Sequence, residues 1–516
     1  MNISQFFEHW QINENPFRGE EARHDAVFAR VAMAPVGGRH ASSHPDFEKI
    51  LGDLSRPSTS VVFGEKGSGK TAIRMQIGDR VRRHNEQNPG ARVLAISYDE
   101  LNGFLDEIHA RVSRGHADAD PAESFKKVRL VDHIDAVLAL GVSRVLESVL
   151  GSGSDGGDLG PDPVRRARQM TSSHKNDLVL LQAVYDRSDV DGRRTAKLRS
   201  RLKLGTPEGR LGWLALAWAG WIPASLAAGV LVFAAEMVTG VPAMIVQVLL
   251  GVFALAWAGV LAKVFILDRL VLGRLGGKIA RQQRFLARPA DAIAASLRWV
   301  PVPMRSSHVL PLTKSDEHRY AMLARLKRVL AHFGITGVLV IMDRVDEPTL
   351  VNGDPDRMKS IVWPLFNNKF LQQEGIGIKL LLPVELRHAL FKESSAFFQE
   401  ARLDKQNMVE RLSWTGAMLY DLCSSRLTAC RPDHAEPVAL VDVFAEDVSR
   451  QDVVDALDQM HQPRDAFKFL YRCLSEHCSN VTGDEQAWRI PKLVLEQVRR
   501  AESERVQQLY RGIRPA

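Results

Sequence analysis

Two long uncharged apolar runs lie next to each other in the interior of the chain. They cover residues 211–235 and 237–262 and are separated only by Glu236. Each run has about 25 residues, and a helix of that length spans roughly 37 Å, more than the hydrocarbon core of a bilayer at about 30 Å. The alternative is a buried hairpin in a soluble core, but core helices rarely run this long without a charge. The sequence therefore predicts a two-helix transmembrane hairpin with a short turn at Glu236–Pro242.

Basic residues are concentrated on both sides of this predicted hairpin. Residues 193–210 contain seven Lys or Arg against one acid, and residues 263–288 contain seven more against one acid. These flanks contribute +12, whereas the whole chain carries +7, so the rest of the chain is acidic. Basic segments beside membrane spans lie on the cytoplasmic side and attract anionic lipids. We therefore expect residues 193–288 to contact an anionic lipid membrane, and the net charge does not favour a nucleic-acid partner.

The same pattern predicts the location of the chain. Both ends of the hairpin should lie in the cytoplasm, which gives a protein with two spans in a cell inner membrane and most of its mass on the cytoplasmic side. Residues 1–10 lack a basic segment followed by an apolar core, so no signal peptide is expected. The hairpin itself would then act as the insertion signal.

A glycine-rich loop precedes the hairpin. The pattern Gly-x4-Gly-Lys-Thr occupies residues 64–71, after an apolar strand at 58–63 and before a helix from Lys70 to Arg83. Glycines allow successive backbone N–H groups to point at phosphate oxygens, and the helix N-terminus adds positive charge. Lys70 would reach the β- and γ-phosphates of ATP, and the Thr71 hydroxyl would bind Mg²⁺. The residues expected to contact the nucleotide are Gly64, Glu65, Lys66, Gly67, Ser68, Gly69, Lys70, Thr71 and Ala72.

Acidic residues end a second buried strand, after the hairpin. Residues 338–342 are apolar and are followed by Asp343, which we expect beside the glycine-rich loop as the second Mg²⁺ ligand. One of Asp346 and Glu347 should polarise the attacking water, although either could instead cap a helix. Arg344 stands where many ATPases carry a catalytic Glu, which argues against fast hydrolysis.

The order of these segments predicts an α/β fold. A strand at 92–98 follows the first helix, and a further buried strand is expected at 377–382, so the strands should form a parallel sheet with right-handed crossovers. We expect a P-loop NTPase domain with an inserted transmembrane hairpin and an α-helical C-terminal lid. The expected segments are an N-terminal lead-in packing on this domain (1–57), its first half (58–150), a linker with basic helices (151–210), the hairpin (211–262), a second basic segment (263–312), the second half (313–400) and the lid (401–516).

Three short motifs give the chain a resemblance to a known group. They are Asp-Arg-Val-Asp-Glu at 343–347, Leu-Leu-Leu-Pro-Val-Glu-Leu at 380–386 and Gln-Pro-Arg-Asp at 462–465. With the inserted helices, the chain resembles KAP-type and signal-transduction (STAND) ATPases of the wider AAA+ group. The resemblance implies that Arg464 of the lid contacts the γ-phosphate, in addition to the catalytic roles of Lys70 and the acids after Asp343. KAP proteins usually show Asp-Asp-Leu-Asp-Arg at the acidic motif, and the motif of this chain is closer to STAND usage.

These features predict a membrane-anchored, Mg²⁺-dependent ATPase. It would act as a nucleotide-driven switch or assembly platform, as a homo-oligomer with an effector protein, and the family resemblance implies signalling or defence in a bacterium. One alternative is a catalytically slow nucleotide-binding scaffold. Another is an origin-recognition-like DNA-binding ATPase, although no winged-helix signal follows residue 480. Transport is disfavoured because the apolar runs contain no ionisable residue.

Several other residues carry weaker signals. An arginine finger could come from a small set of arginines that otherwise form salt bridges or lie on the surface, namely Arg387, Arg402, Arg411 and Arg426. The four cysteines show no zinc-site spacing and are expected to be free buried thiols. The sixteen histidines show no paired-ligand spacing, so no metal other than Mg²⁺ is expected.

Overall fold

The computed structural model divides the chain into two compact units, which are described separately. It describes residues 1–18, 21–32, 43–113, 120–151, 159–205, 207, 210–233, 241–436, 438–482 and 486–510. Unit 1 consists of Met1–Asn88, Ala95–Leu101 and Gly337–Ala516. Unit 2 consists of Pro89–Leu94 and Asn102–Thr336. Residues 102–150 and 313–336, which the sequence assigned to the nucleotide-binding domain, therefore group with the inserted segment instead.

Five strands form a sheet in the order β2-β3-β4-β1-β5. They are β1 (Ser60–Gly64), β2 (Arg92–Tyr98), β3 (Ile335–Met342), β4 (Ile376–Pro383) and β5 (Asn407–Val409). Parallel pairs join β3 to β4, β4 to β1 and β1 to β5. Every residue of β1 and β4 is buried, as expected for parallel strands covered on both faces. The predicted α/β fold with a parallel sheet is confirmed, but the short β5 lies in a region that was expected to be helical.

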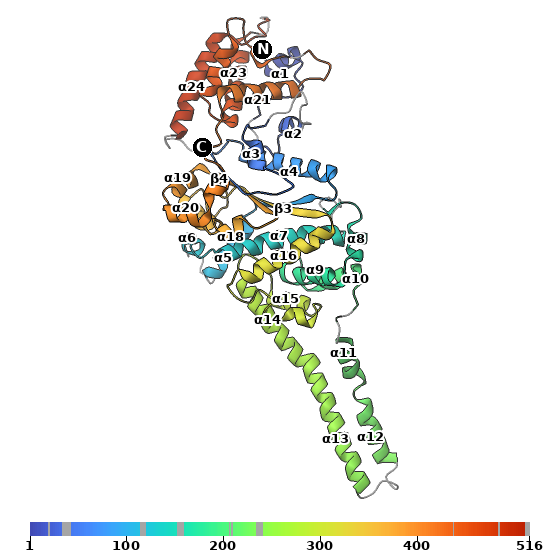
Figure 1. Ribbon diagram of the computed structural model, residues 1–516. Coiled ribbons are helices and arrows are strands. Elements are labelled where there is room, and N and C mark those ends of the chain that lie inside the picture. The colour runs from blue at the N-terminus through green and yellow to red at the C-terminus, as the bar shows by residue number, and fades with distance from the viewer. Residues whose placement is uncertain are drawn as a thin grey trace. The chain divides into compact units, whose positions relative to one another are not determined.

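Helices surround the strands of unit 1 and form its C-terminal part (Figure 1). The helices beside the strands are α3 (Phe47–Leu51), α4 (Lys70–Gln87), α17 (Pro355–Val362), α18 (Asn368–Leu371), α19 (Val384–Phe391) and α20 (Ser395–Ala401). The C-terminal helices, called the lid below, are α21 (Gly416–Ala429), α22 (Arg450–Asp458), α23 (Pro463–Asn480) and α24 (Lys492–Tyr510). A helical C-terminal part was predicted and is present.

The N-terminal residues pack with the lid. Helices α1 (Ile3–His9) and α2 (Ala26–Ala32) bury Phe6 and Val27 in one hydrophobic cluster with Leu419 and Phe469 of the lid. In contrast, α3 lies against β1 and β5. Residues 1–57 were expected to form a lead-in that packs on the nucleotide-binding domain, whereas the structure joins their first part to the lid. Burial of aromatic side chains from both segments accounts for this arrangement.

Unit 2 is a helical body rather than a linker between membrane and sheet. Its helices are α5 (Asn102–Val112), α6 (Pro121–Phe125), α7 (Leu130–Leu150), α8 (Pro163–Gln169), α9 (Ser172–Tyr185), α10 (Arg193–Arg201), α15 (Ala290–Leu297) and α16 (Glu317–His332), with those of the hairpin. All residues of α9 from Asp177 onward are buried. The segment 151–210 therefore contributes to a folded core, and residues 152–158 of the expected linker lie outside the described residues.

Basic flank residues take part in this core. Arg288 and Asp189 are both buried and pair at 3.3 Å, while Arg194 pairs with the buried Asp186 at 3.0 Å. Arg284 pairs with the buried Asp132. All basic residues of the flanks were expected to face lipid. The arginines that pair with buried carboxylates are instead part of the protein core. Exposed basic residues remain on α10 and on the helix that follows the hairpin.

The predicted hairpin is present in part. The first apolar run forms two helices, α11 (Arg210–Ala219) and α12 (Ile222–Phe233), and the second forms α13 (Val241–Ala262), which lies beside α12 (Figure 1). The second helix continues through a π-helical turn, η2 (Lys263–Leu267), into α14 (Asp268–Gln282). Within the described residues, one stretch, Gln247–Gln282, is long and apolar enough to cross a membrane, and only 6% of its apolar 18-residue window is buried. Residues 234–240 of the expected turn lie outside the described residues.

A glycine marks the break between α11 and α12. A Cβ atom on Gly220 would lie 2.6 Å from Trp257 of α13, so only glycine permits this close approach. The Trp257 indole donates a hydrogen bond to the Ala217 carbonyl at 2.9 Å. The Ala217 carbonyl lies in the last turn of α11, where carbonyls lack intrahelical partners. The Trp257 indole supplies the missing donor, which stabilises the helix end most where water is excluded.

Candidate functional site

The loop at 64–71 joins β1 to α4 in unit 1 and has the backbone shape that its glycines predict. Gly67 and Gly69 have φ values of 98° and 97°, which side chains rarely adopt. The Ser68 hydroxyl donates to the Glu65 carbonyl at 2.8 Å, and the Trp414 indole donates to the Ser68 carbonyl at 2.8 Å. The second bond was not foreseen, because Trp414 precedes α21 and lies far from the loop in sequence.

The side chain of Lys70 folds back over this loop. Its ammonium group donates to the carbonyls of Gly64 at 2.7 Å and Glu65 at 3.0 Å. Burial lowers the pKa of Lys70, and the charges of Asp346 and Asp343 oppose that shift. Two carbonyl acceptors and nearby carboxylates therefore hold a cation at the end of the loop, where an anionic ligand could replace the carbonyls.

Thr71 and Asp343 meet at the carboxyl edge of the sheet. The Thr71 hydroxyl donates to the Asp343 carboxylate at 3.0 Å, and Asp343 is buried. Burial raises the pKa of Asp343, and Arg74 and Thr71 oppose this shift. Arg74 lies 3.3 Å from Asp343 and 3.2 Å from Asp99, the acid that follows β2. Sequence reasoning missed Arg74, although its place one turn after Thr71 puts it on the same helix face.

The two acids after Asp343 have different surroundings. Glu347 forms an ion pair with Arg344, whose φ of 62° lies in the left-handed region, and Arg344 also approaches Glu21 at 3.6 Å. The negative charge of Asp346 opposes the lowering of the Lys70 pKa by burial. Both acids line the same cavity as Lys70 and Thr71. The two acids therefore differ in their partners. Glu347 pairs with Arg344, whereas the charge of Asp346 acts on the Lys70 ammonium.

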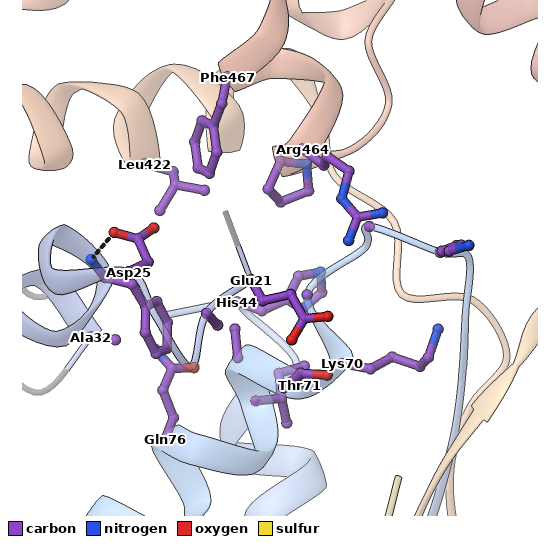
Figure 2. A pocket seen from close by; sticks show the side chains of 18 of the residues that line it. Glu21, Asp25, Ala32, His44, Lys70, Thr71, Gln76, Leu422, Arg464 and Phe467 are labelled. Atoms are coloured by element: carbon purple, nitrogen blue, oxygen red, sulfur yellow. Dashed lines mark hydrogen bonds between the residues drawn. The ribbon is translucent and has the colours of Figure 1, made fainter. Parts of the chain in front are cut away.

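Arg464 begins α23 and lies against the loop. A Cβ atom on Gly67 would be 3.1 Å from the Cβ of Arg464, so the two backbones approach closely. Glu65 of the loop forms an ion pair with Arg411 at 2.6 Å and accepts a hydrogen bond from Gln462. These contacts hold the first turn of α23 at the loop within unit 1. Arg464, Lys70 and Thr71 all line one cavity (Figure 2).

This cavity has a volume of about 210 Å³ and two chemically different ends. One end carries Lys70 and Arg464, whereas Leu422 and Phe467 lie toward the other (Figure 2). Phe28 of α2 also lines it. One end thus combines cations with the acids after β3, and the other combines aromatic and aliphatic side chains with the Asp25–Arg426 pair. Such a cavity suits an elongated ligand that combines metal-bound phosphates with a planar base.

A buried ion pair supports the apolar end. Arg426 is 2% exposed and pairs with Asp25 at 2.8 Å, and its guanidinium carbon lies 4.5 Å from the centre of the Phe467 ring. Arg426 was a weak candidate for an arginine finger, but burial and pairing leave it no access to a second subunit. Arg387 and Arg411 also form ion pairs within the chain. Periodicity alone could not reveal this end of the cavity, because its walls come from separate segments.

The oxygen donors at the loop fit Mg²⁺. Magnesium is usually held by one or two carboxylates with phosphate oxygens and water, and Asp343 with the Thr71 hydroxyl supplies such oxygens. Among the described residues, no group of three or more His, Cys, Asp or Glu is arranged to hold a metal ion without a ligand's help. The four cysteines are free and buried.

Comparisons with protein families, curated proteins and solved structures found no match for this chain.

Proposed function

We propose that this protein binds Mg-ATP and acts as a slow, nucleotide-driven switch anchored in a membrane. The observation that carries the proposal is the cavity of unit 1, where Lys70, Thr71, Asp343 and Arg464 line one end and aromatic side chains line the other. A nucleoside triphosphate has the matching distribution of charge and apolar surface. The strand, glycine-rich loop and helix N-terminus that hold the cationic end form an arrangement suited to phosphate binding.

In this proposal the phosphates replace the loop carbonyls as partners of Lys70. Backbone N–H groups of the loop would surround the phosphate oxygens, and Arg464 would contact the γ-phosphate from α23. Thr71 and Asp343 would hold Mg²⁺, which neutralises charge that develops on the β- and γ-phosphates. The base would lie against Phe28 and Phe467.

Hydrolysis would be slow because few groups are placed to activate water. Glu347 pairs with Arg344, and Asp346, whose negative charge acts on Lys70, is the other acid of this segment that lines the cavity. Water activation then depends on one acid near two cations, which lower its basicity. A nucleotide-binding scaffold with little turnover is the second candidate, and this engagement of Glu347 favours it over a fast enzyme.

Arg464 should distinguish bound ATP from bound ADP. Arg464→Ala should retain ADP binding but lose the preference for ATP, because only ATP offers the γ-phosphate that the guanidinium contacts. The expected loss in the ATP/ADP affinity ratio is about 5–150-fold, the usual range of coupling between sites. Calorimetry with both nucleotides on wild type and variant measures it. Wild-type protein that binds neither nucleotide would refute the function, whereas an unchanged ratio would remove only Arg464 from the mechanism.

The membrane part of the proposal is a two-span anchor in a cell inner membrane with the bulk of the chain in the cytoplasm. The stretch Gln247–Gln282 supports one span by its length and composition. The helices α11 and α12 together cover the length of a second, with the break at Gly220 closed by the hydrogen bond from Trp257. Exposed basic residues that follow η2 support a cytoplasmic end there.

Cysteine labelling tests this topology. A cysteine at Thr239 should react with a membrane-impermeant thiol reagent in intact cells, because the hairpin turn would lie outside. Ser479→Cys, at an exposed position in the lid, should react only after the cells are made permeable. The native cysteines are buried and give a low background. Labelling of the Ser479→Cys variant in intact cells would contradict the proposed topology.

A further inference from the structure

Unit 2 contains a second and larger cavity at the base of the hairpin. Its volume is about 620 Å³, and its walls come from α11, η2, α14, α15 and the short 3₁₀ helix Val302–Arg305. One wall is apolar and includes Trp213, Leu214 and Val271. A volume of this size, bounded by folded helices of one unit, has room for a small organic ligand.

The cavity is also charged. Four cations line it, namely Lys263, Arg269, Arg298 and Arg305, together with two carboxylates, Asp268 and Asp291. Their sum is positive but small. Such a small net positive charge matches an anion of low charge.

Two of the cations are held in place by the protein itself. The Arg305 guanidinium donates to the carbonyls of Val300 at 2.8 Å and Arg298 at 3.1 Å, which fixes its plane. The Lys263 ammonium lies 3.1 Å from the centre of the Trp213 ring. Because Lys263 begins the π-helical turn η2, this turn and the cation–π contact together join the second apolar run to α11 at the mouth of the cavity.

The position of the cavity along the apolar stretch identifies the source of the anion. Residues 247–262 of this stretch are uncharged, and the first cation, Lys263, lines the cavity. In a membrane helix, the change from uncharged to basic residues lies at the level of the lipid headgroups. A ligand there meets cations on one side and an apolar wall on the other, as the phosphate and upper acyl chains of a phospholipid would.

We propose that this cavity binds one singly charged anionic phospholipid, with its phosphate between Arg298 and Arg305 and its upper acyl chains against Trp213 and Val271. This assignment rests on the proposed membrane anchor, but it does not depend on the nucleotide cavity of unit 1. It differs from a general attraction of basic flanks to a charged surface, because it requires open space inside the protein. Such a lipid would fill the base of the hairpin and stiffen the connection between α11 and α14.

Two glycines of α14 allow a matched steric test. A Cβ atom added to Gly273, which lines the cavity, would meet no atom within 4 Å, and the same holds for Gly277, which does not line it. Gly273→Leu therefore fills the cavity without changing charge or forcing the backbone, and Gly277→Leu is its control. Arg305→Gln removes a cation from the lining, and Arg274→Gln removes an exposed cation of α14 that does not line the cavity.

The experiment is a titration of detergent-purified, full-length protein with short-chain dioctanoyl phosphatidylglycerol, with the midpoint of thermal unfolding as readout. Gly273→Leu and Arg305→Gln should each raise the dissociation constant at least about tenfold, as expected for loss of a charge-assisted contact or of the space itself. Gly277→Leu and Arg274→Gln should stay within about twofold of wild type. An equal loss in test and control variants, or no loss in Gly273→Leu, would overturn the proposal.

Two further ligands distinguish the source of the phosphate. Dioctanoyl phosphatidylcholine has the same chains without net charge and should bind at least about tenfold more weakly. Glycerol 3-phosphate carries the phosphate without acyl chains and should give no shift at the same concentration. Equal binding of phosphatidylcholine would show that the cations do not select the ligand. Equal binding of glycerol 3-phosphate would assign the cavity to a free phosphate ester, and either result would overturn the lipid assignment.

Discussion

Replacement of Lys70 by Ala is expected to weaken Mg-ATP binding at least about a hundredfold. Removal of the ammonium leaves phosphate oxygens without their strongest partner, and each charge-assisted hydrogen bond contributes about 1.5–3 kcal/mol, where about 1.4 kcal/mol is tenfold in affinity. The ammonium already sits at the end of the loop, held by the carbonyls of Gly64 and Glu65. Its position therefore requires little rearrangement when phosphate replaces those carbonyls, and the loss in the variant should appear directly in the dissociation constant.

Lys66 supplies the matched control for this experiment. It belongs to the same loop and lines the same cavity, but its side chain is exposed. Lys66→Ala should therefore weaken binding less than about fivefold, since exposed charges contribute up to about 1 kcal/mol. Calorimetry of both variants with Mg-ATP decides between specific and general electrostatic binding. Unchanged affinity in Lys70→Ala would sink the assignment of the cavity to nucleotide.

The charged end of this cavity could be predicted from the sequence because the strand that precedes each residue shows where that residue lies. Asp343 and Thr71 each follow a buried apolar strand, and parallel strands bring their carboxyl ends to one edge. That argument places the two residues together although they are 272 positions apart in sequence, and the structure has them 3.0 Å apart. The presence of these strands was predictable for the same reason, since β1 and β4 are uninterrupted buried runs, although their ends differ from the predicted ones by one or two residues.

The apolar end could not be predicted, because its walls meet only through tertiary packing. Phe28 and Phe467 come from opposite ends of the sequence, and nothing in their local pattern separates them from ordinary core residues. The surroundings of Lys379, outside this cavity, are a second feature that the sequence could not predict. It lies fully buried in β4 with a bond to the Ser58 carbonyl at 2.8 Å, and burial lowers its pKa to about 7. The residues that neighbour Lys379 in sequence predict a buried strand, but they do not show how its ammonium group is accommodated.

The basic flanks show a third limit of sequence reasoning. Their composition predicted lipid contact, yet Arg284 and Arg288 find acidic partners on α7 and in the segment before α10. Charge counts cannot show which cations are neutralised inside a fold, because these partners lie 152 and 99 positions away in sequence. Pairing of this kind gives unit 2 a polar core in addition to its apolar one, and the cost of disturbing it can be measured.

The most deeply buried member of this polar core is the pair of Arg319 and Asp135. Both side chains are fully buried, and the Asp135 carboxylate accepts two hydrogen bonds from the guanidinium at 3.1 Å and one from the Tyr185 hydroxyl at 3.1 Å. Burial raises the pKa of Asp135 to about 6, and the charge of Arg319 and its hydrogen bonds oppose the shift. Arg319 also donates to the carbonyls of Thr313 and Ser315. The pair thus joins α7, α9 and α16.

Loss of one member of this pair should destabilise the protein far more than loss of an exposed pair. Asp135→Ala leaves the Arg319 cation buried without a counter-charge, which costs about 3–5 kcal/mol, or a fall of roughly 10 °C in the midpoint of thermal unfolding. Glu123→Ala breaks the exposed pair with Lys126 on α6 and should cost less than about 1 kcal/mol. The double variant Asp135→Leu with Arg319→Met should recover much of the loss, since it removes both charges and keeps apolar volume. Scanning fluorimetry of the detergent-solubilised chain measures all three variants. If Asp135→Ala unfolded at the same temperature as Glu123→Ala, water or a neighbouring group would have to compensate Arg319, and the pair would not be part of what holds unit 2 together.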